Sequence, residues 1–162
     1  VALYFADKPG DRIARTALLG QPQPPIPAGA ANHRIRSVGI IPEDVEFLSV
    51  APHMHLLGTE MKVTARLPDG TTRVLVWVKN WDYRWQDAYR FTEPVLIPRG
   101  TQIEILAYFN NSTGNPHNTI RPPREVIFGE LTTDEMASVI VEGVVPRQRV
   151  QEPLVEMKPT LP

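Results

Sequence analysis

EMKVTARLPDGTTRVLVWV, residues 60–78, decides the fold class of this chain. Polar and apolar residues alternate over 60–67, so an extended chain there has one apolar face and one wet face. The link at residues 67–71 is a turn, because its proline fixes φ, its aspartate bonds the backbone and its glycine accepts positive φ. Residues 72–78 are rich in valine and carry a tryptophan, as strands are. The stretch therefore predicts an antiparallel β-hairpin with one face buried.

Other short segments with the same β-branched and aromatic composition are predicted as strands. They are residues 2–6, 33–41, 45–51, 94–98, 101–109, 125–131 and 136–145. The proline-rich segment 21–32 and the Asn, Gly and Pro-rich segment 110–124 are predicted as long loops. No helix of ordinary length is evident. The pattern predicts an all-β fold, an antiparallel jelly-roll or Greek-key β-sandwich.

Length and composition indicate one domain, since 162 residues with 42% hydrophobic content can bury a working core. We place the sandwich domain in residues 1–145. Residues 146–162 mix charge and proline without periodicity, and we expect an extended tail there. The chain begins at Val1 without a signal-peptide pattern, and we expect it to be a piece of a longer protein.

Charge and cysteine content exclude several classes of function. The 17 basic and 18 acidic residues are interspersed and give a net charge of −1, which argues against nucleic acid as a partner. No apolar run is long enough for a transmembrane segment. The absence of cysteine excludes disulfides, thiolate zinc sites and thiol nucleophiles.

Two of the four histidines lie one residue apart in APHMHLLG, residues 51–58. On a strand, His53 and His55 project from the same face, which is chelate spacing for a metal. The alternative is a pair of histidines that simply pack in the sandwich, since the motif is short. The apolar neighbourhood favours a metal, because burying two unpaired imidazoles is costly.

A metal held by two histidines needs further ligands, and no cysteine is available. Three residues are candidates for the third ligand: His117 in the 110–124 loop, His33 on the predicted strand 33–41, and Met136. Ligand chemistry alone does not choose among them.

PHMHLLGTEMKV (52–63) and FGELTTDEMASVIV (128–141) together resemble the second copper domain of the copper type II, ascorbate-dependent monooxygenases. This is the family of peptidylglycine α-hydroxylating monooxygenase and dopamine β-monooxygenase. VALYFAD (1–7) and IPAG (26–29) also resemble the start of that domain. The resemblance implies that His53, His55 and Met136 bind one copper ion, cycling between Cu(I) and Cu(II).

A soft thioether with two imidazoles suits Cu(I) and leaves a position open for a small ligand. Asp134 and Glu135 are then expected to be turn or strand-edge residues and not ligands. No catalytic residue is assigned.

The sequence also departs from that family. The family's electron-delivering first domain is not in this chain. The arginine, asparagine and tyrosine with which the peptide-processing members hold a substrate carboxylate correspond to Ala51, Ser138 and Ile140, so peptide hydroxylation is not expected.

The 110–124 loop resembles bacterial relatives that accompany c-type cytochromes or other redox modules in the cell envelope. The resemblance thus implies a periplasmic or extracytoplasmic setting, with a c-type cytochrome, a separate N-terminal copper domain or membrane-complex subunits as partners. The expected function is the oxygen-activating half of a copper monooxygenase. The alternative is a non-catalytic accessory or structural subunit of a membrane-associated electron-transfer complex, with or without copper.

Overall fold

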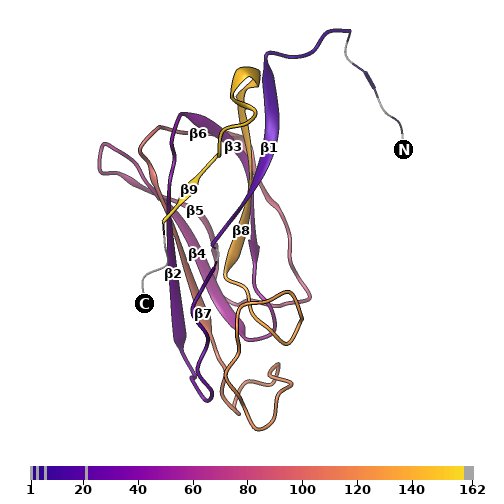
Figure 1. Ribbon diagram of the computed structural model, residues 1–162, viewed down its shortest axis with the longest axis vertical. Coiled ribbons are helices and arrows are strands. Elements are labelled where there is room, and N and C mark those ends of the chain that lie inside the picture. The colour runs from indigo at the N-terminus through magenta and orange to yellow at the C-terminus, as the bar shows by residue number, and fades with distance from the viewer. Residues whose placement is uncertain (1, 3, 6, 21, 159–162) are drawn as a thin grey trace.

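Two antiparallel β-sheets form the body of the computed structural model, which describes residues 2, 4–5, 7–20 and 22–158 (Figure 1). One sheet has the order β1-β8-β3-β6 and the other β5-β4-β7-β2-β9. The first contains β1 (Arg12–Leu19), β8 (Ser138–Pro146), β3 (Val45–His53) and β6 (Tyr89–Ile97). The second contains β5 (Thr72–Val78), β4 (Gly58–Arg66), β7 (Gln102–Phe109), β2 (His33–Ile40) and β9 (Glu156–Met157). Among the described residues, no helix has the length and apolar character needed to span a membrane.

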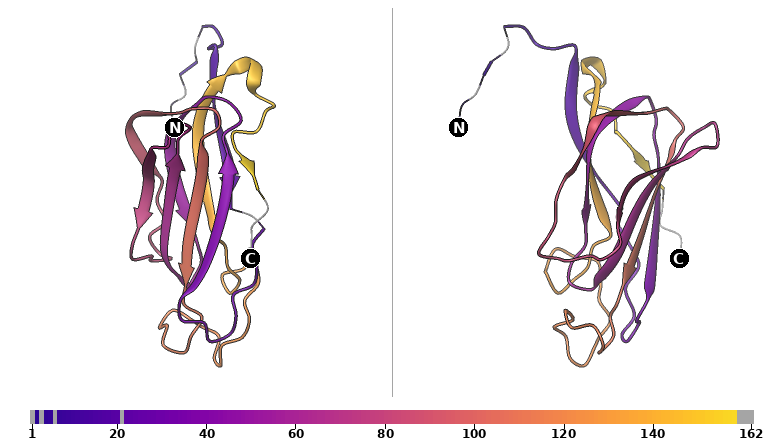
Figure 2. Two further views of the ribbon diagram at one scale, coloured as in Figure 1. Left: turned by 90° about the vertical axis from the view of Figure 1, so that its left-hand side faces the viewer. Right: turned by 180° about the vertical axis from the view of Figure 1, so that it is seen from behind.

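The connectivity of the first eight strands is that of a jelly roll. Strand order 1-8-3-6 faces 5-4-7-2, so the chain crosses between the layers at nearly every connection and only β4 and β5 form a hairpin within one sheet. Figure 2 shows the two layers face to face from the side and from behind. The predicted all-β, antiparallel jelly-roll sandwich is therefore confirmed.

The core lies between the sheets and follows the alternation read from the sequence. Met61, Val63 and Ala65 of β4 are fully buried, while the residues between them are half-exposed. From the opposite sheet, Phe47 and Val50 of β3 are also fully buried. One apolar face on each sheet thus closes a single core.

The predicted hairpin turn is present with the expected chemistry. Leu67 N–H donates to Thr71 O at 2.8 Å, and Thr71 N–H donates to the Asp69 carboxylate at 2.8 Å. Gly70 has φ of 86°, a conformation that glycine adopts without strain. The turn fixes the register of β4 against β5.

Two strand predictions are wrong, and one strand was not predicted. Residues 2, 4 and 5 are not in a strand, with Tyr4 and Phe5 almost fully exposed, and residues 3 and 6 lie outside the described part. The first described strand is instead β1, which was not predicted because both of its faces mix polar and apolar residues. Residues 125–131 make only isolated bridges, because Val126 is buried against Ile26 while its neighbours point to solvent.

Part of the segment expected as a tail lies on the sandwich. After Pro146 the chain makes a 3-10 turn (Arg147–Arg149), and β9 then pairs with β2. Leu154 and Val155 are buried in the core. Gly39 of β2 permits this approach, because a Cβ there would overlap the Val155 side chain.

Candidate metal centre

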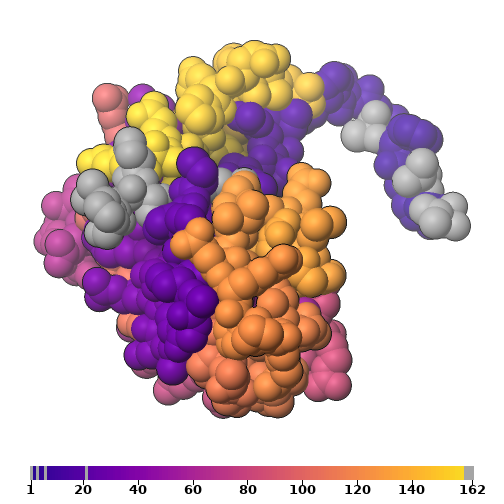
Figure 3. Space-filling view, turned by 60° about the horizontal axis from the view of Figure 1, so that its bottom comes forward, coloured from indigo at the N-terminus to yellow at the C-terminus, as the bar shows by residue number. Residues whose placement is uncertain are grey.

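The two histidines lie where β3 ends, beside the start of β8. His53 is the last residue of β3 and pairs with Ser138, the first residue of β8. Met136 precedes Ser138 by two residues, so the backbone register brings its segment alongside the 53–55 segment. The loops of residues 110–137 (orange) gather at this end of the sandwich, next to the violet segment around residues 20–40 (Figure 3).

The imidazoles of His53 and His55 face one another through their Nε2 atoms. Their Nε2 atoms are 3.2 Å apart, and the ring planes are inclined at 80° with centroids 5.0 Å apart. His55 is 4% exposed and His53 is half-buried, so the pair opens to solvent on the His53 side.

The other nitrogen of each ring has an oxygen partner. His53 Nδ1 lies 2.6 Å from Gln86 Oε1, and His55 Nδ1 lies 3.1 Å from the carbonyl oxygen of Asp134. The Gln86 amide is oriented by its own nitrogen, which donates to Tyr83 O at 2.9 Å. Both partners are acceptors, so each neutral imidazole carries its proton on Nδ1 and donates it.

If both rings carry the proton on Nδ1, the two Nε2 lone pairs face each other. Burial lowers the pKa of His55, the hydrogen bond to the Asp134 carbonyl opposes this, and the adjacent His53 lowers the pKa further. A cation between the nitrogens removes the repulsion. A metal with bonds of about 2.0–2.1 Å to two imidazoles in tetrahedral geometry holds them roughly 3.3 Å apart, close to the spacing observed. The pair thus fits a metal as a two-nitrogen chelate.

Glu135 joins the histidine segment to the methionine segment. Its Oε2 accepts hydrogen bonds from the backbone N–H of His55 at 2.8 Å and of Met136 at 3.2 Å, and its Oε1 accepts from Leu57 N–H at 2.6 Å. The side chain is 1% exposed. Burial raises the pKa of Glu135 to about 7, opposed by the three backbone hydrogen bonds.

The three candidates for the third ligand are placed differently. Met136 is half-buried, and its backbone shares Glu135 Oε2 with that of His55. His33 lies on β2 in the other sheet, and His117 is exposed in the 110–124 loop. In the described part of the chain no three or more His, Asp and Glu side chains are grouped to hold a metal, so neither histidine joins the pair.

Aromatic residues of the β5–β6 connection cover the pair. Trp81 Nε1 donates to the carbonyl oxygen of His55 at 3.1 Å, and the Tyr83 ring lies edge-on to the His55 ring with centroids 6.1 Å apart. The same connection supplies Gln86. This segment therefore both shields His55 and orients His53.

The outer face of the sheet beside the pair is apolar. Ala51 pairs with Ile140, and Ile140 pairs with Leu18 across three strands. Ile140 is 44% exposed and Leu18 is 54% exposed, whereas Val139 and Val141 are fully buried, so Ile140 points outward. None of the three side chains in this row carries a charge.

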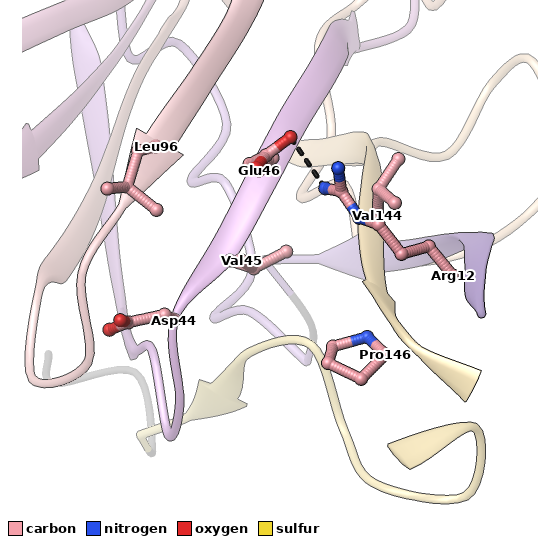
Figure 4. Close-up of a pocket in the computed structure, with 7 residues that line it drawn as sticks. All are labelled: Arg12, Asp44, Val45, Glu46, Leu96, Val144 and Pro146. Carbon is pink, nitrogen blue, oxygen red and sulfur yellow. Dashed lines mark ion pairs between the residues drawn. The ribbon is translucent and has the colours of Figure 1, made fainter. Parts of the chain in front are cut away.

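A hollow lies at the opposite end of β3 from the histidine pair. Figure 4 shows its lining, which is Arg12, Asp44, Val45, Glu46, Leu96, Val144 and Pro146. Arg12 and Glu46 form an ion pair at 2.6 Å, and Asp44 accepts from Arg99 N–H. Its charged groups are already partnered, so we assign no site there.

Sequence reasoning missed Gln86 and the role of Glu135. Gln86 contacts His53 across 33 residues in a segment without a motif, and nothing in the sequence marks it. Glu135 stands beside Met136 and was expected at a turn or strand edge. Its burial depends on backbone groups 78 and 80 residues away, which no local pattern encodes.

The chain was compared with protein families, curated proteins and solved structures. No protein-family model matches the chain, and no curated protein matches it. Among solved structures, a chain from "Structure of infectious bursal disease virus Gx strain" aligns with 99% of this chain at 13% identity and a TM-score of 0.37. This chain spans 41% of that viral chain.

Proposed function

We propose that this chain is a copper-binding domain in which His53, His55 and Met136 hold a single copper ion, as in the oxygen-activating half of a copper type II monooxygenase. The observation that carries the proposal is that the Nε2 atoms of His53 and His55 face each other at 3.2 Å. Each Nδ1 is already engaged by an oxygen acceptor, the outer-shell arrangement that metal-binding histidines adopt.

The donor set favours copper over other metals. The thioether is a soft ligand and the two neutral imidazoles are borderline ones, a combination that suits Cu(I) better than harder cations. Copper bound in this set with one open position supplies one-electron chemistry toward dioxygen.

The chain's own residues would orient the ligands and control access. Gln86 and the Asp134 carbonyl fix the tautomer and plane of each imidazole, and burial keeps His55 neutral for metal binding. The half-buried His53 leaves a path for a small ligand. The apolar row of Leu18, Ala51 and Ile140 offers no cation to a carboxylate, so we do not propose a peptide substrate.

The same row supports the second candidate function, a non-catalytic accessory subunit of a membrane-associated electron-transfer complex. Exposed Leu18 and Ile140 lie beside the copper ligands, where a partner that exchanges electrons would cover them. The proposed partners are a c-type cytochrome, an N-terminal copper domain or membrane-complex subunits, in a periplasmic or extracytoplasmic setting.

Anaerobic Cu(I) titration against a chromogenic chelator tests the site. We expect one copper per chain in the wild type and strong loss of affinity in His53→Ala, His55→Ala and Met136→Leu. His117→Ala and Met157→Leu are matched controls outside the site and are expected to bind as the wild type does. Unchanged affinity in the first three variants would show that the ligand assignment is wrong.

Copurification from the native source separates the two functions. An accessory subunit is expected to elute with a cytochrome or membrane partner, and Leu18→Glu with Ile140→Glu is expected to release it while leaving copper affinity unchanged. A free chain that consumes dioxygen with ascorbate and an added C–H substrate would favour the monooxygenase.

A further inference from the structure

We propose that Glu135, assisted by Gln23, is a positioning residue that sets Met136 relative to the two imidazoles before any metal binds. This inference rests on the proposed copper site. It assigns a role to a buried carboxylate that the ligand set does not use.

The Glu135 carboxylate accepts hydrogen bonds from both segments that carry the proposed ligands. One oxygen, Oε2, receives the backbone N–H groups of both His55 and Met136, and the other receives that of Leu57. The metal-ligand residues His55 and Met136 are 81 positions apart in the sequence, and one atom fixes their backbones together. An apolar side chain would fill the same volume but would not create this directional link.

Burying the Glu135 carboxyl group has a desolvation cost that its hydrogen bonds must offset. A carboxylate that is 1% exposed is stable only when its oxygens are hydrogen-bonded, and here three backbone donors satisfy it. Core packing alone does not call for a carboxyl group at this position. The group is therefore explained by what it holds together.

Gln23 provides a second set of hydrogen bonds to the backbone on both sides of Met136. Gln23 Nε2 donates to Glu135 O at 3.0 Å, and Gln23 Oε1 accepts from Ala137 N–H at 2.7 Å. Gln23 thus holds the residue before and the residue after Met136, as a neighbouring strand would. Gly20 permits the same segment to approach, because a Cβ there would overlap the Ala137 carbonyl.

The segment that contains Met136 also contacts His55. Two consecutive residues contact it, because the Asp134 carbonyl accepts from the ring Nδ1 and the Glu135 carboxylate accepts from the backbone N–H. The next residue, Met136, donates its own backbone N–H to that carboxylate. The segment that carries the thioether is thus the segment that orients one imidazole. Ligands held in this way lose little freedom on binding metal, which raises affinity.

The test uses the methyl signals of the four methionines, labelled with ¹³C, in the metal-free protein and during titration with Ag(I) as a redox-inert stand-in for Cu(I). Met136→Leu assigns the Met136 signal. In the wild type we expect that signal to shift on Ag(I) binding. In Glu135→Gln we expect about 10–100-fold weaker Ag(I) and Cu(I) binding, as for loss of an outer-shell partner. Glu130→Gln, an exposed glutamate of the same loop, is the matched control and is expected to bind like the wild type.

A double-mutant cycle separates positioning from a purely structural role. If Glu135 acts through Met136, Glu135→Gln weakens Ag(I) binding in the wild type but adds little in the Met136→Leu background. Equal weakening in both backgrounds, or none in the wild type, would overturn the inference while leaving the copper site intact. A wild-type Met136 signal that ignores Ag(I) would instead refute the proposed ligand set. Should Glu135→Gln fail to fold, Gln23→Ala takes its place in the same cycle with the same two outcomes.

Discussion

Gln86 provides a direct check on the geometry of the histidine pair, because its side chain is exposed and touches His53 through a single hydrogen bond of 2.6 Å. Replacing it with alanine removes the acceptor for His53 Nδ1–H without disturbing the core. The proton is then free to move to Nε2, the atom proposed to bind copper. The metal must displace it, so the affinity for Cu(I) is expected to fall.

Loss of an outer-shell partner of a metal-binding histidine lowers affinity about 10–100-fold, or roughly 1.4–2.7 kcal/mol. Because water can reach the exposed Nδ1 and replace the amide, we expect the lower end, about tenfold. Gln86→Glu keeps an acceptor and adds a negative charge, and is expected to bind copper at least as tightly as the wild type. Gln151→Ala, at another exposed glutamine, is the neutral control.

Two assays read the effect. Competition with a Cu(I) chelator gives the affinity, and long-range ¹H–¹⁵N correlation spectra of the metal-free protein give the tautomer of each histidine at a pH where both are neutral. We predict Nδ1–H for His53 and His55 in the wild type and a shift of His53 toward Nε2–H in Gln86→Ala. Wild-type spectra showing Nε2–H on both rings would refute the reasoning, as would an unchanged affinity in Gln86→Ala.

Three further predictions concern stability. Gly20→Ala is expected to lower the free energy of unfolding by about 1–3 kcal/mol in urea titrations, because Gly20 has φ of 98° and a Cβ would meet the Ala137 carbonyl; equal stability would contradict this. Phe109→Ala, at a fully buried core position, is expected to cost about 3–5 kcal/mol in the same assay, and a loss below about 1 kcal/mol would show the core is not formed as described. Burial lowers the pKa of His33, so the folded protein resists its protonation and stability falls as pH drops below about 6.5, where the unfolded chain takes up the proton. The difference in unfolding free energy between wild type and His33→Phe, measured from pH 8 to pH 5, should therefore move against the wild type on acidification, and parallel curves would refute this.

The parts of the fold that follow from local pattern were predictable. The 60–78 hairpin combines alternation in its first strand with a Pro-Asp-Gly turn, and the structure has that turn and the antiparallel pairing, together with a register shift between Val63 and Thr64 that the pattern did not predict. Strand β1 was missed because neither of its faces is uniformly polar or apolar. Its outer face includes the exposed Leu18, and one of its inner positions is Arg15, whose guanidinium donates to the backbone of the C-terminal segment at Glu152. That partner is 137 residues away, so the pattern of β1 has an explanation only in the folded chain.

The pairing of the two histidines was predictable, whereas the residues that support it were not. The spacing of His53 and His55 predicted that their rings lie together, as the structure has them, and Met136 as a copper ligand stays a prediction that comes from the resemblance. The residues that orient this segment are far from it in the sequence. Gln86 contacts His53 at a separation of 33 residues, and Gln23 contacts Glu135 at a separation of 112 residues. Such contacts depend on how the strands cross between the sheets, which local sequence does not state.

X-ray absorption at the copper edge of the Cu(I)-loaded protein tests the central claim most directly. The account predicts two imidazole nitrogens and one sulfur around the metal, with the sulfur lost in Met136→Leu and retained in Met157→Leu. A copper environment without sulfur, or one that Met136→Leu leaves unchanged, would contradict it.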